Sequence, residues 1–260
     1  MYQELIPNAT TIVIADLFCD ASVGPDLRGA CAGVTLEHRL RPDMSMTDAD
    51  VPKGLSYSIQ PDGTNNSGES MAVAMGVNLA LTWNDIFRNM YPFAFIHFNI
   101  FSDSLITING VREWLPGWIQ HAAGNTLRNS RGDIVKNQEY FKFIYNSILR
   151  APANFSVSFY HQDGHVTKNY RSIEEPFYKR NGVTLQQIGI SAETICLAND
   201  FVDRHTRGYI NEFLNNPVKA GYYEANSIAS GSYMESDILS ADPEVVNEYR
   251  ARVQKQLIVR

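Results

Sequence analysis

The chain has 260 residues, of which 44% are hydrophobic, 11% aromatic and 19% charged, so it can bury a core and is not a disordered segment. Its net charge of −6 is uneven, because residues 1–110 carry 5 basic and 12 acidic side chains and residues 128–180 carry 9 basic and 5 acidic ones. This pattern suits cations bound in one region and phosphates in another, and it also suits an ordinary solvated surface.

The predicted elements begin with three strands, at 11–22, 29–40 and 54–60, which are rich in β-branched and aromatic residues and are separated by turn-forming residues. Short connections predict an antiparallel meander. Residues 67–83 are apolar nearly all round, which indicates a helix buried on more than one side. Residues 91–101 are continuously apolar, as in the middle strand of a covered sheet.

After that strand the hydrophobic period changes. Leu105, Ile108, Val111 and Leu115 have helical spacing, and we expect the Pro116–Gly117 pair to end this helix. The remaining expectations are helices at 134–149, 193–214 and 242–257, a fifth strand at 154–165, and a polar, irregular segment at 166–192. The order of elements predicts an α/β protein, a mixed sheet with helices on its faces.

The cysteines and the apolar runs bear on where the protein works. Cys19, Cys31 and Cys196 lack the spacing of a zinc site, and we expect buried thiols in a reducing compartment. No run approaches the roughly 18 apolar residues of a membrane span, and the first residues do not read as a targeting signal. We therefore expect a cytoplasmic protein that does not enter a membrane.

Four carboxylates stand where a strand ends or near where a helix begins: Asp20, Glu69, Asp103 and Asp203. The ends of neighbouring strands converge in a mixed sheet, and acids brought together repel one another unless cations lie between them. Oxygen ligands without a His/Cys cluster suit Mg²⁺ or Mn²⁺. Taken singly, each acid also reads as a helix cap or a surface charge. Asp16 shares a strand face with Asp20, and we interpret it as a non-ligand.

Five motifs surround these acids in order: "CDAS" with "GACAGV" beyond it, "TNNSGESMA", "FSDSLITINGVREWL", "VKNQEYF" and "NDFVD". Over about residues 10–215 the chain thereby resembles type 1 ribonuclease H. The resemblance implies a ribonuclease H-like fold whose five-stranded sheet has three antiparallel strands and then two parallel ones. It implies a domain at 1–215 with a long insertion at about 166–192, followed by a C-terminal extension at 216–260 that is helical at 242–257.

The resemblance also implies an activity. Asp20, Glu69, Asp103 and Asp203 would bind two Mg²⁺ ions, with Mn²⁺ as a possible substitute, and the enzyme would hydrolyse the RNA strand of an RNA–DNA hybrid. The products would carry 5′-phosphate and 3′-hydroxyl ends. Asp200 lies one helical turn from Asp203 and is the competing fourth ligand.

Further residues follow from the same motifs. His165 matches a mobile histidine that assists proton transfer or product release, with His161 as the nearby competitor. Asn65 and Asn66 match asparagines that touch the minor groove of the hybrid. The matched motifs add three more substrate contacts: Ser22, Lys136 and Asn137.

Three departures separate the chain from that family. Leu105 stands where many relatives have a glutamine, and the handle region has few basic residues beyond Arg128, Arg131 and Lys136. The third departure is the long segment at 166–192, whose basic residues could replace the missing charge: Lys168, Arg171, Lys179 and Arg180.

Two other functions remain open on the sequence. A DNA nuclease of the same fold, of resolvase or exonuclease type, would use the same acids, although an exonuclease would carry Asp-x-Glu where this chain has Asp20-Ala21-Ser22. A catalytically silent module for binding or assembly is the other alternative. No family counterpart or partner is assigned to residues 216–260.

Overall fold

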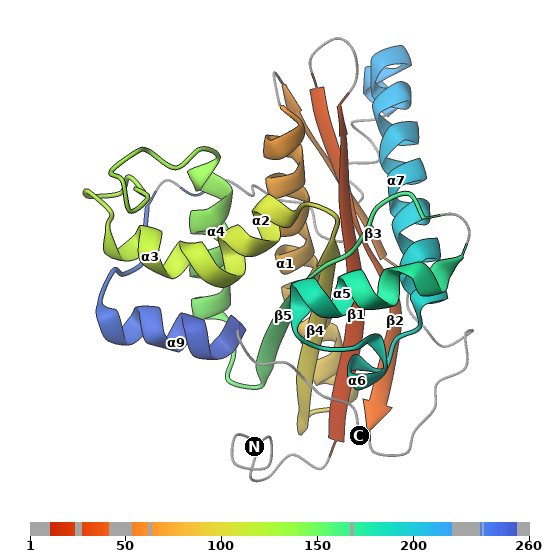
Figure 1. Ribbon diagram of the computed structural model, residues 1–260, viewed down its shortest axis with the longest axis horizontal. Helices are drawn as coiled ribbons and strands as arrows, with labels where there is room; N and C mark the ends of the chain where they lie inside the picture. The colour runs from red at the N-terminus through yellow and green to blue at the C-terminus, as the bar shows by residue number, and fades with distance from the viewer. Residues whose placement is uncertain are drawn as a thin grey trace.

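A single five-stranded sheet organises the chain in the computed structural model, which describes residues 11–23, 28–41, 54–61, 64–166, 169–219, 235 and 237–253 (Figure 1). The strand order is β3-β2-β1-β4-β5. β1 pairs antiparallel with β2, and β2 with β3, whereas β1, β4 and β5 run parallel. The predicted mixed sheet is confirmed. Its strands are β1 (Thr11–Val23), β2 (Arg28–Arg41), β3 (Gly54–Pro61), β4 (Ala94–Ser102) and β5 (Phe155–His161).

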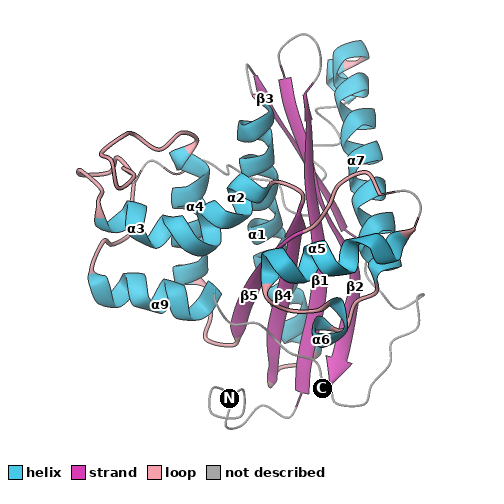
Figure 2. Cartoon of the chain, viewed as in Figure 1, coloured by secondary structure: helices cyan, strands magenta, loops and turns pink. Residues whose placement is uncertain are grey.

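One face of the sheet is covered by a group of helices that share the larger core, with α1 directly against the sheet (Figure 2). Alternate residues of β1, including Val13, Leu17 and Cys19, point into this core. Helix α1 lies so close to β1 that a Cβ on Gly76 would stand 2.4 Å from the Sγ of Cys19. The helices are α1 (Asn65–Met90), α2 (Leu105–Asn109), α3 (Leu115–Gln120), α4 (Gln138–Arg150) and α9 (Pro243–Val253).

The opposite face is covered by the segment predicted to be polar and irregular, and that prediction was wrong. The segment contains a 3₁₀ turn (Tyr170–Ile173), α5 (Glu174–Asn181) and α6 (Leu185–Ile188), and it leads into α7 (Ala192–Asn215). Its apolar residues pack on Phe18, Phe101 and Tyr160 in a second core. Elements of one or two turns are too short for a hydrophobic period to identify, so only the sheet beneath them determines their fold.

Several boundaries differ from the sequence prediction. After α2 the chain makes a π-helical turn at Gly110–Trp114 and continues as α3 through Pro116 and Gly117, because the π-helical turn just before Pro116 interrupts the regular α-helical hydrogen-bond pattern and accommodates the proline. The fifth strand ends at His161 rather than at residue 165, and α4 begins at Gln138. Among the helices of the described ranges, none is long and apolar enough to cross a bilayer.

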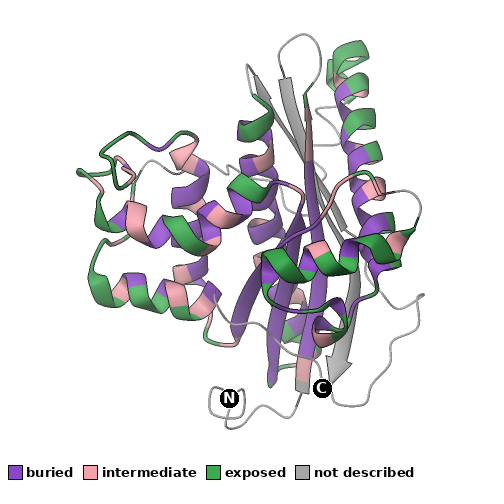
Figure 3. Ribbon diagram, in the orientation of Figure 1, coloured by how far each residue is buried: buried purple, intermediate pink, exposed green. Residues whose placement is uncertain are grey.

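Both faces of the three parallel strands are covered, and β4 and β5 are buried along their whole length (Figure 3). The C-terminal helix α9 contributes Val246, Tyr249 and Val253 to the larger core. The Tyr249 hydroxyl donates to the carbonyl of Val111 at 2.9 Å. Residues 243–253 therefore fold as part of the main core; residues 254–257 of the predicted helix lie outside the described ranges.

Candidate active site

Two of the four candidate acids follow equivalent positions of neighbouring parallel strands. Phe18 of β1 pairs with Phe101 of β4, and their rings stack with centroids 4.8 Å apart. Asp20 and Asp103 each come two residues later, so the pleat places both on the face of the sheet that carries the stacked rings. Asp20 remains in β1, opposite Ala32 of β2, whereas Asp103 lies just beyond the end of β4.

The other two acids come from helices that pack on opposite faces of the sheet. α1 begins at Asn65, two residues earlier than predicted, so Glu69 lies in its second turn and not in its first. Asp203 lies in the middle of α7 and is buried, with a side chain 9% exposed. Asp200 is 37% exposed and pairs with Arg204, whereas the charge of Asp203 acts on both Asp20 and Asp103.

Electrostatic coupling shows that these acids lie near one another. Burial, followed by the charges of Asp103, Asp203 and Glu69, raises the pKa of Asp20 to about 8, against a hydrogen bond from the Ala21 amide. Burial also raises the pKa of Asp103, which the Asp203 charge increases and the His165 charge decreases. The pKa of Glu69 is raised by burial and by Asp103, although a hydrogen bond from Ser104 opposes this.

The way the acids lie bears on whether they could bind a cation. Among the described side chains, no three of His, Cys, Asp or Glu stand close enough to ligate a single ion as they lie. Glu69 accepts from Ser104 at 2.5 Å through one oxygen and from Asn65 at 2.9 Å through the other. Hard, partly buried carboxylate oxygens whose charges repel are a donor set that fits Mg²⁺ or Mn²⁺, and binding would require their side chains to turn toward a common point.

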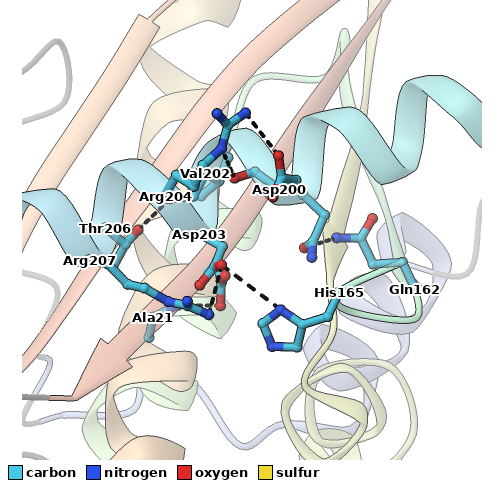
Figure 4. A network of polar contacts seen from close by, with 11 residues as sticks. Ala21, Gln162, His165, Asp200, Val202, Asp203, Arg204, Thr206 and Arg207 are labelled. Carbon is cyan, nitrogen blue, oxygen red and sulfur yellow. Dashed lines mark hydrogen bonds and ion pairs between the residues drawn. The ribbon is translucent and has the colours of Figure 1, made fainter. Parts of the chain in front are cut away.

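Two basic side chains lie beside Asp203, and Figure 4 shows both directed at its carboxylate. Arg207 pairs with Asp203 Oδ2 at 2.8 Å, and Nδ1 of His165 lies 3.9 Å from the same oxygen. The His165 side chain is 68% exposed, on a residue with φ of 58°, which is uncommon for a side chain of this size. Sequence reasoning missed Arg207, although its spacing of four residues from Asp203 on a helix was the available signal.

The loop after β5 closes this part of the site. A Cβ on Gly164 would stand 2.5 Å from Oδ2 of Asp103, so this loop passes directly over that carboxylate. His161, the competitor of His165, is buried at the end of β5, where burial and the Arg180 charge lower its pKa. Its Nε2 lies 3.0 Å from the backbone carbonyl of Asp103, a contact that no sequence motif indicated.

The residues predicted to contact substrate differ in their exposure and in whether they already have a hydrogen-bond partner. Asn66 and Lys136 are exposed, and Ser22 is half-buried. Asn65 is exposed but already donates to Glu69. Asn137 has a φ of 55° and precedes α4. Lys136 and Asn137 belong to the loop between α3 and α4, on the far side of α1 from α7 (Figure 1).

Two of the four basic residues of the 166–192 segment, Lys179 and Arg180, are engaged in ion pairs. Lys179 pairs with Glu175 at 2.5 Å, and Arg180 pairs with Asp163 and contacts His161. Arg171 is exposed, and Lys168 lies outside the described residues. Arg180 is therefore bound within the protein, which weakens the interpretation of this segment as a free phosphate-binding loop.

No family model matches this chain, and no curated protein does. Solved structures give weak likenesses. LC9-RNase H1, described as a type 1 RNase H with the type 2 active-site motif, has 14% identity and a TM-score of 0.40 over 66% of this chain and 73% of that one. RNase H1 of the halophilic archaeon Halobacterium salinarum has 10% identity and a TM-score of 0.32, over 63% of this chain and 93% of that one.

A foamy viral protease-reverse transcriptase, solved with an RNA/DNA hybrid, has 13% identity and a TM-score of 0.36. That likeness covers 67% of this chain and 19% of the viral protein, so the chain spans about a fifth of its length. Scores and identities of this size say nothing about activity.

Proposed function

We propose that this protein has a ribonuclease H-like fold and hydrolyses the RNA strand of RNA–DNA hybrids in a reaction that depends on divalent cations. The observation that carries the proposal is that Glu69, Asp103 and Asp203, from separate parts of the chain, lie near enough to Asp20 for their charges to raise its pKa. Burial and mutual repulsion raise the pKa of Asp20 to about 8, which is costly for a fold that has no use for the cluster. Five sequence motifs in order support the same activity.

The proposed chemistry assigns a task to each part of the site. The four carboxylates would hold Mg²⁺ or Mn²⁺, and such ions, when bound, make an attacking water more acidic and stabilise the leaving 3′ oxygen. His165, exposed on the loop beside Asp103 and Asp203, would move a proton at the product oxygen. Asn66, exposed at the start of α1, would contact a 2′-hydroxyl in the minor groove.

The test is a cleavage assay on three matched duplexes, RNA–DNA, RNA–RNA and DNA–DNA, with Mg²⁺ and then with chelator. We expect cleavage of the RNA strand in the hybrid alone, with 5′-phosphate and 3′-hydroxyl ends. Asp103→Asn is the matched variant: it keeps the shape of the side chain but removes a charge, and it should abolish hydrolysis while the protein stays folded.

The same assay separates the alternatives. Cleavage of DNA–DNA in preference to hybrid would reassign the protein to the DNA nucleases. Binding of hybrid without cleavage would favour the silent module, and full activity of Asp103→Asn would exclude the proposed site.

A further inference from the structure

The end of β5 carries a chain of hydrogen bonds that runs from the 166–192 segment to Asp103. Asn181, the last residue of α5, is 2% exposed. Its side chain accepts from the backbone amide of His161 at 2.9 Å and donates to the backbone carbonyl of the same residue at 2.8 Å. Both backbone groups of His161 are thus bound by one amide, which fixes the position of that residue relative to α5.

A second residue of α5 determines which ring nitrogen of His161 carries the proton. NH1 of Arg180 lies 3.1 Å from Nδ1 of His161. A guanidinium can only donate, so Nδ1 must accept and carries no proton. The proton of the neutral ring then lies on Nε2, which stands 3.0 Å from the backbone carbonyl of Asp103 and donates to it.

Arg180 is itself held in place. It pairs with Asp163, which lies two residues beyond His161 on the loop over the site. Arg112, from the π-helical turn, donates to Oδ1 of Asn181 at 3.0 Å and so joins α5 to the elements on the other side of β5. Both polar atoms of the Asn181 side chain and both ring nitrogens of His161 have a partner of the correct donor or acceptor type, which is the condition under which a polar network rigidifies a site.

We propose that His161 is a positioning residue, that Arg180 and Asn181 of α5 fix its place and tautomer, and that its Nε2–H holds the backbone of Asp103. The 166–192 segment thereby becomes part of the support of the site rather than an appended loop. The assignment of Asp103 as a ligand rests on the proposed function, but the hydrogen-bond chain rests on the contacts alone. Loss of a partner that orients a metal ligand lowers metal affinity or activity by about 10–100-fold.

The first experiment determines the tautomer in the full-length protein, by NMR of ¹⁵N-labelled histidine. We expect the His161 proton on Nε2 in the wild type and in Arg180→Lys, which still donates to Nδ1. Arg180→Met should lose the fixed tautomer. A wild-type ring protonated at Nδ1 would overturn the proposal, because Nε2 would then have no proton to donate to Asp103.

The second experiment compares two amides at position 161, which differ in reach. The amide nitrogen of His161→Gln extends to about the place of Nε2 and can donate to Asp103, whereas that of His161→Asn stops near Nδ1. We expect Mn²⁺ affinity, measured calorimetrically without nucleic acid, to be almost unchanged in His161→Gln and about 10–100-fold weaker in His161→Asn. On hybrid, kcat should fall in the Asn variant with KM nearly constant.

Thermal unfolding without metal is the control for a merely structural role. Equal Mn²⁺ affinities in the two variants, with equal losses of Tm, would overturn the positioning role. A wild type that binds Mn²⁺ but cleaves no hybrid would overturn the proposed activity, and the difference between Gln and Asn in Mn²⁺ affinity would still support the hydrogen-bond chain.

Discussion

Arg207 reaches back one turn along α7 and pairs with Oδ2 of Asp203 at 2.8 Å, so the fourth candidate ligand is neutralised by its own helix. The Asp203 side chain is 9% exposed and that of Arg207 is 55% exposed. One turn earlier, Arg204 pairs with Asp200 at the same distance of 2.8 Å, but nearer to solvent. α7 therefore carries two ion pairs of the same spacing, of which only one involves a candidate ligand.

This pair predicts competition between Arg207 and a divalent cation. Arg207→Met should lower the Mg²⁺ concentration needed for half-maximal cleavage by about twofold to fivefold, the size expected of one partly exposed ion pair. A titration of cleavage rate against Mg²⁺ measures it. Arg204→Met is the matched control and should leave the midpoint unchanged; equal shifts in both variants would indicate a general effect of net charge instead.

The choice between Asp203 and Asp200 makes a second prediction. Asp203 contributes to the raised pKa of both Asp20 and Asp103, whereas Asp200 is more exposed and pairs with Arg204. Asp203→Asn should therefore reduce kcat far more than Asp200→Asn, by about 10²-fold or more against a change of less than about threefold. Single-turnover cleavage of hybrid by the two variants measures the two losses. A larger loss in Asp200→Asn than in Asp203→Asn would assign the fourth ligand to Asp200, one helical turn earlier.

The raised pKa of Asp20 makes stability depend on pH. The native state keeps a proton on Asp20 up to about pH 8, whereas the unfolded chain releases it near pH 4. Between these values the native state binds more protons than the unfolded state, so the free energy of unfolding should fall as pH rises. Urea unfolding in chelator at pH 5, 6, 7 and 8 should show this decline.

The matched variant for this experiment is Asp20→Asn, which does not titrate. Its stability should decline less over the same range and should exceed that of the wild type at the upper end. A wild type whose metal-free stability rises from pH 5 to pH 8 would show that Asp20 is not held in its protonated form.

The close approach of α1 to β1 makes a prediction about packing. A Cβ on Gly76 would meet Sγ of Cys19 at 2.4 Å, so Gly76→Ala should destabilise the protein by about 1–2 kcal/mol despite the higher helix propensity of alanine. Gly208 of α7 has no neighbour within 4 Å of its missing Cβ, and Gly208→Ala should stabilise by about 0.5–1 kcal/mol. Urea unfolding measures both changes.

The cause of the first change can be isolated in a double-mutant cycle. Cys19→Ala removes the clashing sulfur, so the cost of Gly76→Ala should be smaller in that background. An equal cost in both backgrounds would place the strain elsewhere in α1.

Much of the fold was predictable from the sequence because its signals are local. The largely apolar β4 and the β-branched run of β1 identified strands, and the apolar residues of α1 identified a helix buried on more than one side. Asp20 and Asp103 were visible as candidates because each stands at the end of such a run. Cys19 and Cys196 are buried and free, as expected, while the side chain of Cys31 lies outside the described residues.

Other features depended on contacts between residues far apart in the chain. The short helices of the 166–192 segment form because Phe18, Phe101 and Tyr160 offer an apolar surface to residues such as Phe177 and Ile188. The spacing of hydrophobic residues within the segment does not predict that such a surface lies opposite it.

The sequence by itself therefore determined the sheet, the main helices and the four candidate carboxylates, since hydrophobic period and motif order are properties of neighbouring residues. Only the tertiary structure decided how those carboxylates are held. Asp203 is set apart from Asp200 by its burial, Arg207 occupies one of its oxygens, and His161 reaches the backbone of Asp103 across 58 positions in the chain. The physical reason is that burial and hydrogen-bond geometry depend on where distant segments meet, and the spacing of residues along the chain does not contain that information.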